Sequence, residues 1–196
     1  IQSYLETAEQ FVNELDIPVI APLQCERTPI WVTLAEQLRE AGVAAIELRP
    51  AVEEMSRTMR SDQIEKTILR VTASVAGRVD VPVIVRIPAG GLGLIAFVQA
   101  LGDADATAVA IRRNAVMRSF DLNGLQLRPE PEDETGRLAA FQAQLTSCRS
   151  LYRRVNPHLA VVLPTGAPDA LSAALLAGST LGTIPVEGED PQSAAQ

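Results

Sequence analysis

Short runs of β-branched and aliphatic residues alternate along the chain with stretches whose apolar residues recur at helical spacing. Each run closes on a polar, proline or glycine turn, and this alternation predicts a parallel sheet packed against helices. We therefore predict the α/β class and a TIM (β/α) barrel that is partial, with about six of the eight strand–helix units. The predicted strands cover residues 18–24, 44–49, 81–87, 107–112, 159–163 and 181–186.

The composition predicts one folded domain. Of the 196 residues, 47% are hydrophobic and 21% are charged, which is enough apolar sequence for one well-packed core. We place a single β/α-barrel domain at residues 1–187 and a polar tail at 188–196. A complete barrel usually needs about 250 residues, and the helical pattern of residues 3–15 has no strand before it. We expect two further strands to precede Ile1, and another subunit or a second copy to cover the open edges of the sheet.

Charge and hydropathy exclude two classes of partner. The net charge of −7 opposes nucleic-acid binding, which needs a positive surface. No apolar run reaches the roughly 18 residues that span a bilayer, and the first residues do not have a signal-peptide profile. We therefore expect no membrane insertion and a cytoplasmic location.

Reactive side chains are scarce. The lone lysine, Lys66, falls in a helical stretch away from any predicted strand end, so a strand-borne Schiff-base lysine has no candidate. The lone histidine, His158, precedes a strand and so lies at the end of the barrel opposite the usual active site. The cysteines, Cys25 and Cys148, are far apart and lack metal-ligand spacing, and we interpret Cys148 as a buried helix residue. A metal site is therefore not expected.

Alternation along the predicted strands sends several charged residues to the inner face of the sheet. In residues 44–49 the aliphatic positions should meet the helices, which leaves Glu47 and Arg49 pointing inward. The same argument places Arg86 and Arg112 inside. Burying three arginines with one carboxylate is costly unless they are paired or bind an anion, so we expect an ion-pair network around Glu47.

Several segments together resemble the dihydroorotate dehydrogenase-like flavin barrels. They follow one another in that family's order and with similar spacing, over nearly the whole chain. The segments are Tyr-Leu-Glu at 4–6, Asp-Ile-Pro-Val-Ile-Ala at 16–21, residues 31–38, Glu-Ala-Gly at 40–42, Ile-Glu-Leu at 46–48, Val-Pro-Val at 81–83, Asp-Leu at 121–122 and Ala-Gly at 177–178.

The resemblance implies a flavin mononucleotide (FMN) site that is largely substituted. Active members hold FMN with asparagines and a lysine at strand ends and with glycines at the phosphate. Among the matching residues only Gly166 keeps the expected type, and Gln24 is a partial substitute. The family's serine or cysteine base has no clear equivalent, and Ser56, Ser61 and Cys25 are candidates by location alone. The cofactor-equivalent positions are Gln24, Arg49, Arg86, Arg112, Thr165 and Gly166.

These substitutions leave three functional hypotheses. The favoured one is a degenerate, non-catalytic barrel without a cofactor that acts as a structural or regulatory subunit. The second is a barrel that binds a phosphate or carboxylate anion, with Arg49, Arg86 and Arg112 as a clamp and backbone N–H groups near Gly166. The third is a still-active FMN-dependent oxidoreductase with Cys25 or a serine as its base.

Overall fold

The computed structural model describes most of the first two thirds of the chain and parts of the remainder. The described residues are 1–24, 28–88, 93–112, 118–121, 126–129, 142, 145–151, 154, 160–164 and 181–183. Residues 145–151 are helical, as predicted for the longer stretch 137–155. The predicted helix at 169–177 and the polar tail at 188–196 lie outside the described residues.

Six parallel strands form the main sheet, and they correspond to the six strands predicted from the sequence. Each strand pairs with the next one of the sheet in chain order, so the order never reverses. This is the arrangement of a β/α barrel, because a doubly wound sheet reverses its strand order at a switch point. The strands are β1 (Ile20–Leu23), β2 (Ala45–Leu48), β3 (Val83–Pro88), β4 (Ala108–Arg112), β7 (Ala160–Pro164) and β8 (Leu181–Thr183).

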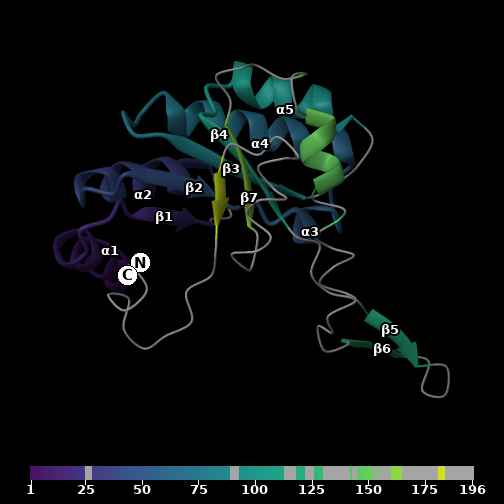
Figure 1. The fold of residues 1–196 in the computed structure, drawn as a ribbon, viewed down its shortest axis with the longest axis horizontal. Helices are drawn as coiled ribbons and strands as arrows, with labels where there is room; N and C mark the ends of the chain where they lie inside the picture. Colours follow the sequence, from purple (N-terminus) through teal and green to yellow (C-terminus); the bar gives the residue numbers. More distant parts are fainter. Residues whose placement is uncertain are drawn as a thin grey trace.

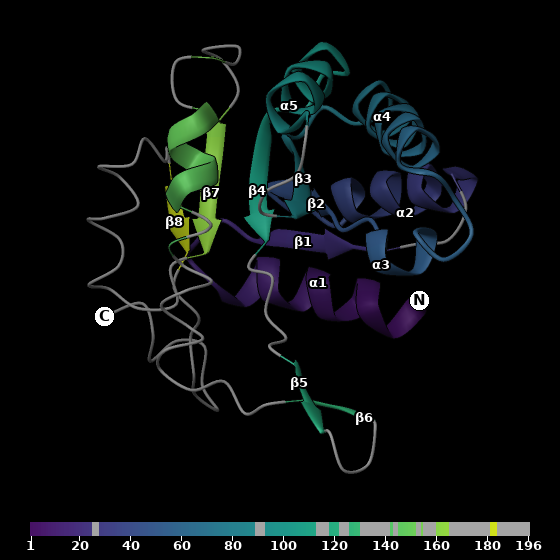
Figure 2. The ribbon, with the colours of Figure 1, turned by 90° about the vertical axis from the view of Figure 1, so that its right-hand side faces the viewer.

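The helices form a layer in the same order as the strands. Helix α1 (Gln2–Glu14) contacts α2 (Thr28–Glu40), which contacts α4 (Ser61–Ala76), and α4 contacts α5 (Leu94–Asp103). Figure 1 and Figure 2 show α2, α4 and α5 side by side over the sheet, with α1 beside β1. The sequence analysis did not predict α3 (Val52–Met55), a single turn that follows β2.

The two faces of the sheet differ as the period-two pattern predicts. In β3, Val83, Val85 and Ile87 are buried, and Ile84 and Arg86 between them are half-buried. The first set joins the main core under the helices, which also contains Leu38 of α2 and Leu101 of α5. The opposite face carries a small second cluster of Ala108 and Ala110 with Ile84 and Ala160. The inner face therefore carries short side chains beside Arg86.

A short excursion leaves the main sheet after β4. Strand β5 (Arg118–Asp121) pairs antiparallel with β6 (Gln126–Pro129), and the pair extends away from the sheet in Figure 1. The sequence predicted a turn-linked excursion at residues 121–127. The structure confirms it and adds the pairing.

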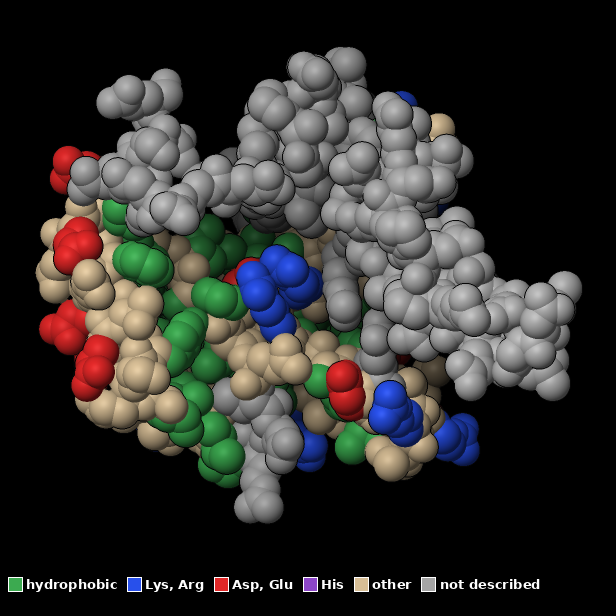
Figure 3. All heavy atoms as spheres, turned by 90° about the horizontal axis from the view of Figure 1, so that it is seen from below, with side chains coloured by type: hydrophobic (Ala, Val, Ile, Leu, Met, Phe, Trp, Pro, Cys, Tyr) green, Lys and Arg blue, Asp and Glu red, His purple; other side chains and the backbone are tan. Residues whose placement is uncertain are grey.

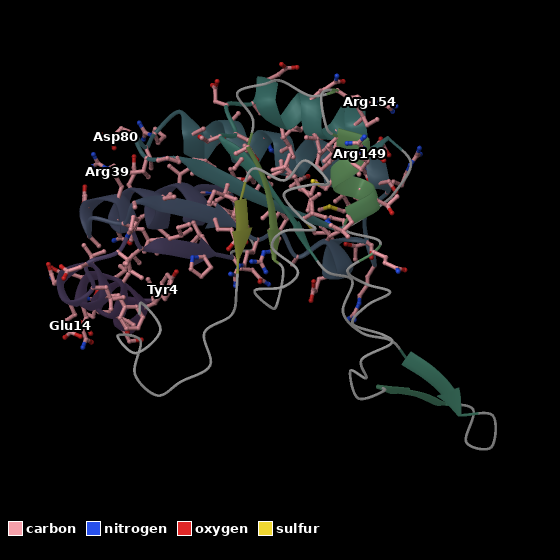
Figure 4. The ribbon with its side chains drawn as sticks, viewed as in Figure 1. Tyr4, Glu14, Arg39, Asp80, Arg149 and Arg154 are labelled. Carbon is pink, nitrogen blue, oxygen red and sulfur yellow. The ribbon has the colours of Figure 1, made fainter. Side chains whose placement is uncertain are left out.

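Hydrogen bonds and ion pairs join neighbouring elements on the outside of the molecule. Arg39 of α2 lies 3.9 Å from Asp80, which precedes β3, and Figure 4 shows both at one end of the molecule. Toward the other end, where Arg149 and Arg154 are labelled, the Gln99 amide of α5 donates to the Arg154 carbonyl oxygen at 2.9 Å. Ion pairs this exposed contribute little to stability, so the core sets the fold.

Helix α1 reaches the outer edge of β1 through Tyr4. The backbone N–H of Arg49 bonds the Leu23 carbonyl oxygen, so the carbonyl of the preceding residue, Pro22, points away from β2. The Tyr4 hydroxyl donates a hydrogen bond to that Pro22 oxygen, and Figure 4 shows Tyr4 beside β1. This contact joins the first helix to the first strand.

Two glycines adopt left-handed backbone conformations with different surroundings. Gly42 has a φ of +87° just after α2, and an added Cβ would lie 3.1 Å from Cγ1 of Val12 on α1. Gly93 has a φ of +84° before α5, and no atom of the described residues lies within 4 Å of an added Cβ. The first position combines backbone strain with close packing, and the second carries backbone strain alone.

We expect Gly93→Ala to lower the free energy of unfolding by about 1 kcal/mol, because a Cβ is disfavoured at positive φ. Gly42→Ala should cost more, by about another 1 kcal/mol, because Val12 must also move. Urea unfolding of the two variants measures the difference. Equal losses would show that α1 does not pack tightly against Gly42.

Candidate functional site

The candidate site lies at the carboxyl ends of β2 and β3, on the inner face of the sheet. Leu48 of β2 pairs with Val85 of β3, so the next residues along the two strands are Arg49 and Arg86. Glu47 lies opposite Ile84, one step earlier. Alternation gives Glu47, Arg49 and Arg86 the same face, as the sequence analysis predicted.

The two arginines share the single carboxylate. Arg49 donates from Nε and Nη2 to Oε2 of Glu47 at 3.2 Å and 2.9 Å, and Arg86 donates from Nε to Oε1. The Glu47 side chain is only 10% exposed, whereas those of Arg49 and Arg86 are 39% and 31% exposed. The ion-pair network expected around Glu47 is therefore confirmed for two of its three arginines.

This geometry leaves a local positive charge that faces solvent. Both Glu47 oxygens accept hydrogen bonds, which satisfies the buried carboxylate, while two guanidinium groups carry two positive charges against one negative. Among the described residues, the Nη1 groups of both arginines and Nη2 of Arg86 have no further partner. Figure 3 shows basic side chains with an acidic one beside them in a hollow at the centre of one face. Such N–H groups suit bidentate contact with a carboxylate or phosphate.

The remaining cofactor-equivalent positions contribute less. Gln24 directly follows β1, level with Arg49, is exposed and makes no hydrogen bond to either arginine among the described residues. The backbone of Arg112 lies in β4 opposite Pro88, and its side chain lies outside what the structure describes. Thr165 and Gly166 also lie outside the described residues.

The described residues that were considered for catalysis lie on or beside helices and not on the strands that carry the arginines. Ser56 follows α3 and Ser61 begins α4, and both are exposed. Lys66 lies on the surface of α4, 3.8 Å from Asp62, which confirms that it is away from the strand ends. Cys148 is buried in a helical segment, as predicted. Cys25 and His158 lie outside the described residues.

The described part of the site does not fit a metal ion. No group of three or more His, Cys, Asp or Glu side chains within the described ranges is placed to hold one. Glu47 is the carboxylate that the described inner face offers, and both of its oxygens already accept from arginines. An oxygen-seeking cation would have to displace these bonds and would face two positive charges.

The sequence analysis missed α3 and the side chains that it positions. Val52, Met55 and Met59 follow one another at spacings of three and four residues, which is a helical period. That pattern is the sequence signal that could have indicated the turn.

The fold resembles those of TIM-barrel enzymes. A phosphonopyruvate hydrolase superposes with a TM-score of 0.57 and 19% identity, covering 92% of this chain and 58% of that one. In its complex with oxalate and Mg²⁺ the same enzyme gives 0.54 and 15%, covering 96% and 65%. Dihydrodipicolinate synthase from Bacteroides thetaiotaomicron gives 0.55 and 11%, covering 92% and 51%. A protein described as a lactate oxidase from Pediococcus acidilactici gives 0.54 and 16%, covering 92% and 50%.

These comparisons establish the fold and leave the activity open. No protein-family model matches the chain, and no curated protein matches it. The chain spans about half to two thirds of the length of the solved barrels that it resembles. At such low identity the likeness identifies an α/β TIM-barrel fold with a parallel sheet.

The resemblance to dihydroorotate dehydrogenase-like barrels is wrong as a family assignment. The structural neighbours are phosphonopyruvate hydrolase, dihydrodipicolinate synthase and lactate oxidase, which do not single out that family. The segments that carried the resemblance are strand ends, glycine turns and helix starts, such as Glu-Ala-Gly at 40–42. Every β/α unit needs these features to turn a helix back onto the sheet, so they do not identify a cofactor.

Two further expectations concern a membrane span and a bound flavin. None of the described helices is long and apolar enough to cross a membrane. The absence of bound flavin, which rested on the substituted positions, stays a prediction.

We expect Glu47→Gln to lower the free energy of unfolding by about 1–3 kcal/mol, because two guanidinium groups would lose their shared carboxylate. The partial exposure of both arginines keeps the loss at the low end for such a network. Urea unfolding provides the measurement, with Glu36→Gln, which removes the surface pair with Arg78, as the control. A loss no larger than that of the control would contradict a stabilising role for the network.

Burial raises the pKa of the Cys148 thiol to about 11, because the thiolate would have to leave water. In a Cys25→Ser background we expect Cys148 to remain unreactive toward Ellman's reagent at about pH 8 until the protein unfolds. Reaction at the rate of a free thiol in the native protein would contradict this burial.

Proposed function

We propose that this protein binds a small anion, a carboxylate or a phosphate, at the carboxyl ends of β2 and β3. The observation that carries the proposal is the sharing of one buried carboxylate by Arg49 and Arg86, which leaves an excess positive charge on half-exposed guanidinium groups. In β/α barrels the carboxyl ends of the strands form the ligand-binding end. The guanidinium groups therefore lie at the end of the barrel where ligands usually bind.

Glu47 positions the arginines as well as pairing with them. It holds Arg49 through Oε2 and Arg86 through Oε1, so both side chains are ordered before a ligand arrives. Binding then costs less side-chain entropy, which favours an incoming anion. A carboxylate or a phosphate offers oxygens that match the planar N–H fork of arginine.

The solved barrels are compatible with this ligand class. One was crystallised with oxalate, and another is named for lactate oxidation. Small carboxylic acids are thus bound by proteins of this fold. None of the comparisons supports the alternative of a non-catalytic structural or regulatory subunit.

We expect phosphate or oxalate to raise the melting temperature more than sodium chloride at matched ionic strength. At ten times the dissociation constant the gain is about 1.4 kcal/mol, or about 3–6 °C for a domain of this size. Differential scanning fluorimetry across a concentration series measures the shift. Equal shifts with all three salts would overturn the proposal.

Variants locate the site. Arg86→Gln and Arg49→Gln should each remove most of the anion-dependent shift, whereas Arg78→Gln, which removes an arginine paired with Glu36 on the surface, should leave it intact. The comparison uses each variant's own anion-free melting temperature, so a loss of stability does not mimic a loss of binding. A full shift in both Arg86→Gln and Arg49→Gln would place the anion elsewhere.

A further inference from the structure

A cavity lies in the helical layer beside the end of β2, and neither Arg49 nor Arg86 belongs to its described lining. It has a volume of about 620 Å³ and is enclosed by α2, α3 and α4 above the ends of β1 and β2. Trp31, Leu48, Met55, Ile68 and Val71 form its apolar walls. This volume falls in the range of small-molecule sites.

Both apolar and polar side chains line the cavity. Trp31, Leu48, Ile68 and Val71 are between 1% and 8% exposed, so the cavity is cut into the core. The Thr72 hydroxyl on its lining donates to the Ile68 carbonyl oxygen of its own helix at 2.9 Å. A ligand would gain contact with these apolar walls and would meet polar groups beside them, because the lining also includes Gln24, Thr28, Thr58 and Thr67.

The charge of the lining distinguishes this cavity from the arginine site. Glu54 of α3 is the charged side chain of the described lining, which includes no lysine or arginine. Among the described residues of the lining this carboxylate has no positive neighbour, which disfavours an anionic ligand and tolerates an amine. The two sites therefore favour ligands of different charge: anions at the arginine pair, and neutral molecules or amines in the cavity.

Two methionines are among the side chains that line the cavity. Met55 and Met59 belong to or follow α3, and Met59 is 40% exposed. Methionine side chains adjust to ligands of different shape. Because α3 follows β2, it belongs to the loops at the carboxyl end of the strands, where barrels place their ligand contacts.

We propose that this cavity binds a compact apolar molecule, either uncharged or carrying a single amine, independently of the anion site. Trp31 is the single tryptophan of the chain and lies in the cavity wall, so its fluorescence reports occupancy directly. Cyclohexylmethanol, cyclohexylmethylamine and cyclohexanecarboxylate share one ring and differ in charge, and none absorbs where tryptophan does. The alcohol and the amine should change Trp31 emission saturably and raise the melting temperature, and the carboxylate should bind most weakly.

Two variants with matched controls test the assignment. Ala51→Leu places a larger side chain in the lining and should abolish the fluorescence response, whereas Ala96→Leu, on the exposed face of α5, should preserve it. Glu54→Gln alters an exposed carboxylate and should weaken amine binding by about two- to five-fold while leaving the alcohol unaffected. Should Ala51→Leu fail to fold, Glu54→Gln still tests the site.

Three results would overturn the proposal. They are the absence of a saturable response to the alcohol and the amine, an unchanged response in folded Ala51→Leu, and equal amine binding by wild type and Glu54→Gln. Loss of the phosphate response in Arg86→Gln concerns the other site and does not bear on this one.

Discussion

Glu47 is the constraint around which the inner face of the sheet is organised. A carboxylate that is only 10% exposed loses most of its hydration, and both of its oxygens recover partners from arginines on two adjacent strands. The same bonds fix the direction of Arg49 and Arg86. The buried carboxylate needs hydrogen-bond partners, and the arginines that supply them form an ordered cationic surface. This surface lies at the end of the barrel where ligands are usually bound.

The sequence was enough to predict this arrangement because it depends on the alternation of aliphatic and charged residues along β2 and β3. The aliphatic residues of β2 and β3 have to meet the helices, and their neighbours then face the interior of the barrel. The register of the two strands determines which residues become neighbours. Leu48 pairs with Val85, so the next residues, Arg49 and Arg86, lie side by side. The six strands and their chain order follow from the repeated strand–turn–helix pattern of the sequence.

Features that depend on tertiary packing were not predictable in this way. The turn α3 is only four residues long, and the cavity that its Met55 lines forms only when α2 and α4 pack beside it. The pairing of β5 with β6 depends on contacts between segments whose local sequence reads as loop. The family resemblance failed for a related reason. Turn and cap residues reflect how the chain turns between a strand and a helix. Barrels with unrelated chemistry share these turns.

The first strand of the sheet has an additional property that follows from Pro22. Its amide nitrogen carries no hydrogen and points away from β2, and its carbonyl oxygen already accepts from Tyr4. A strand arriving from another molecule would find neither a donor nor a vacant acceptor at this position. Any strand that pairs with this side of β1 therefore lacks backbone hydrogen bonds at Pro22, so the ladder between the two strands would be interrupted at that residue.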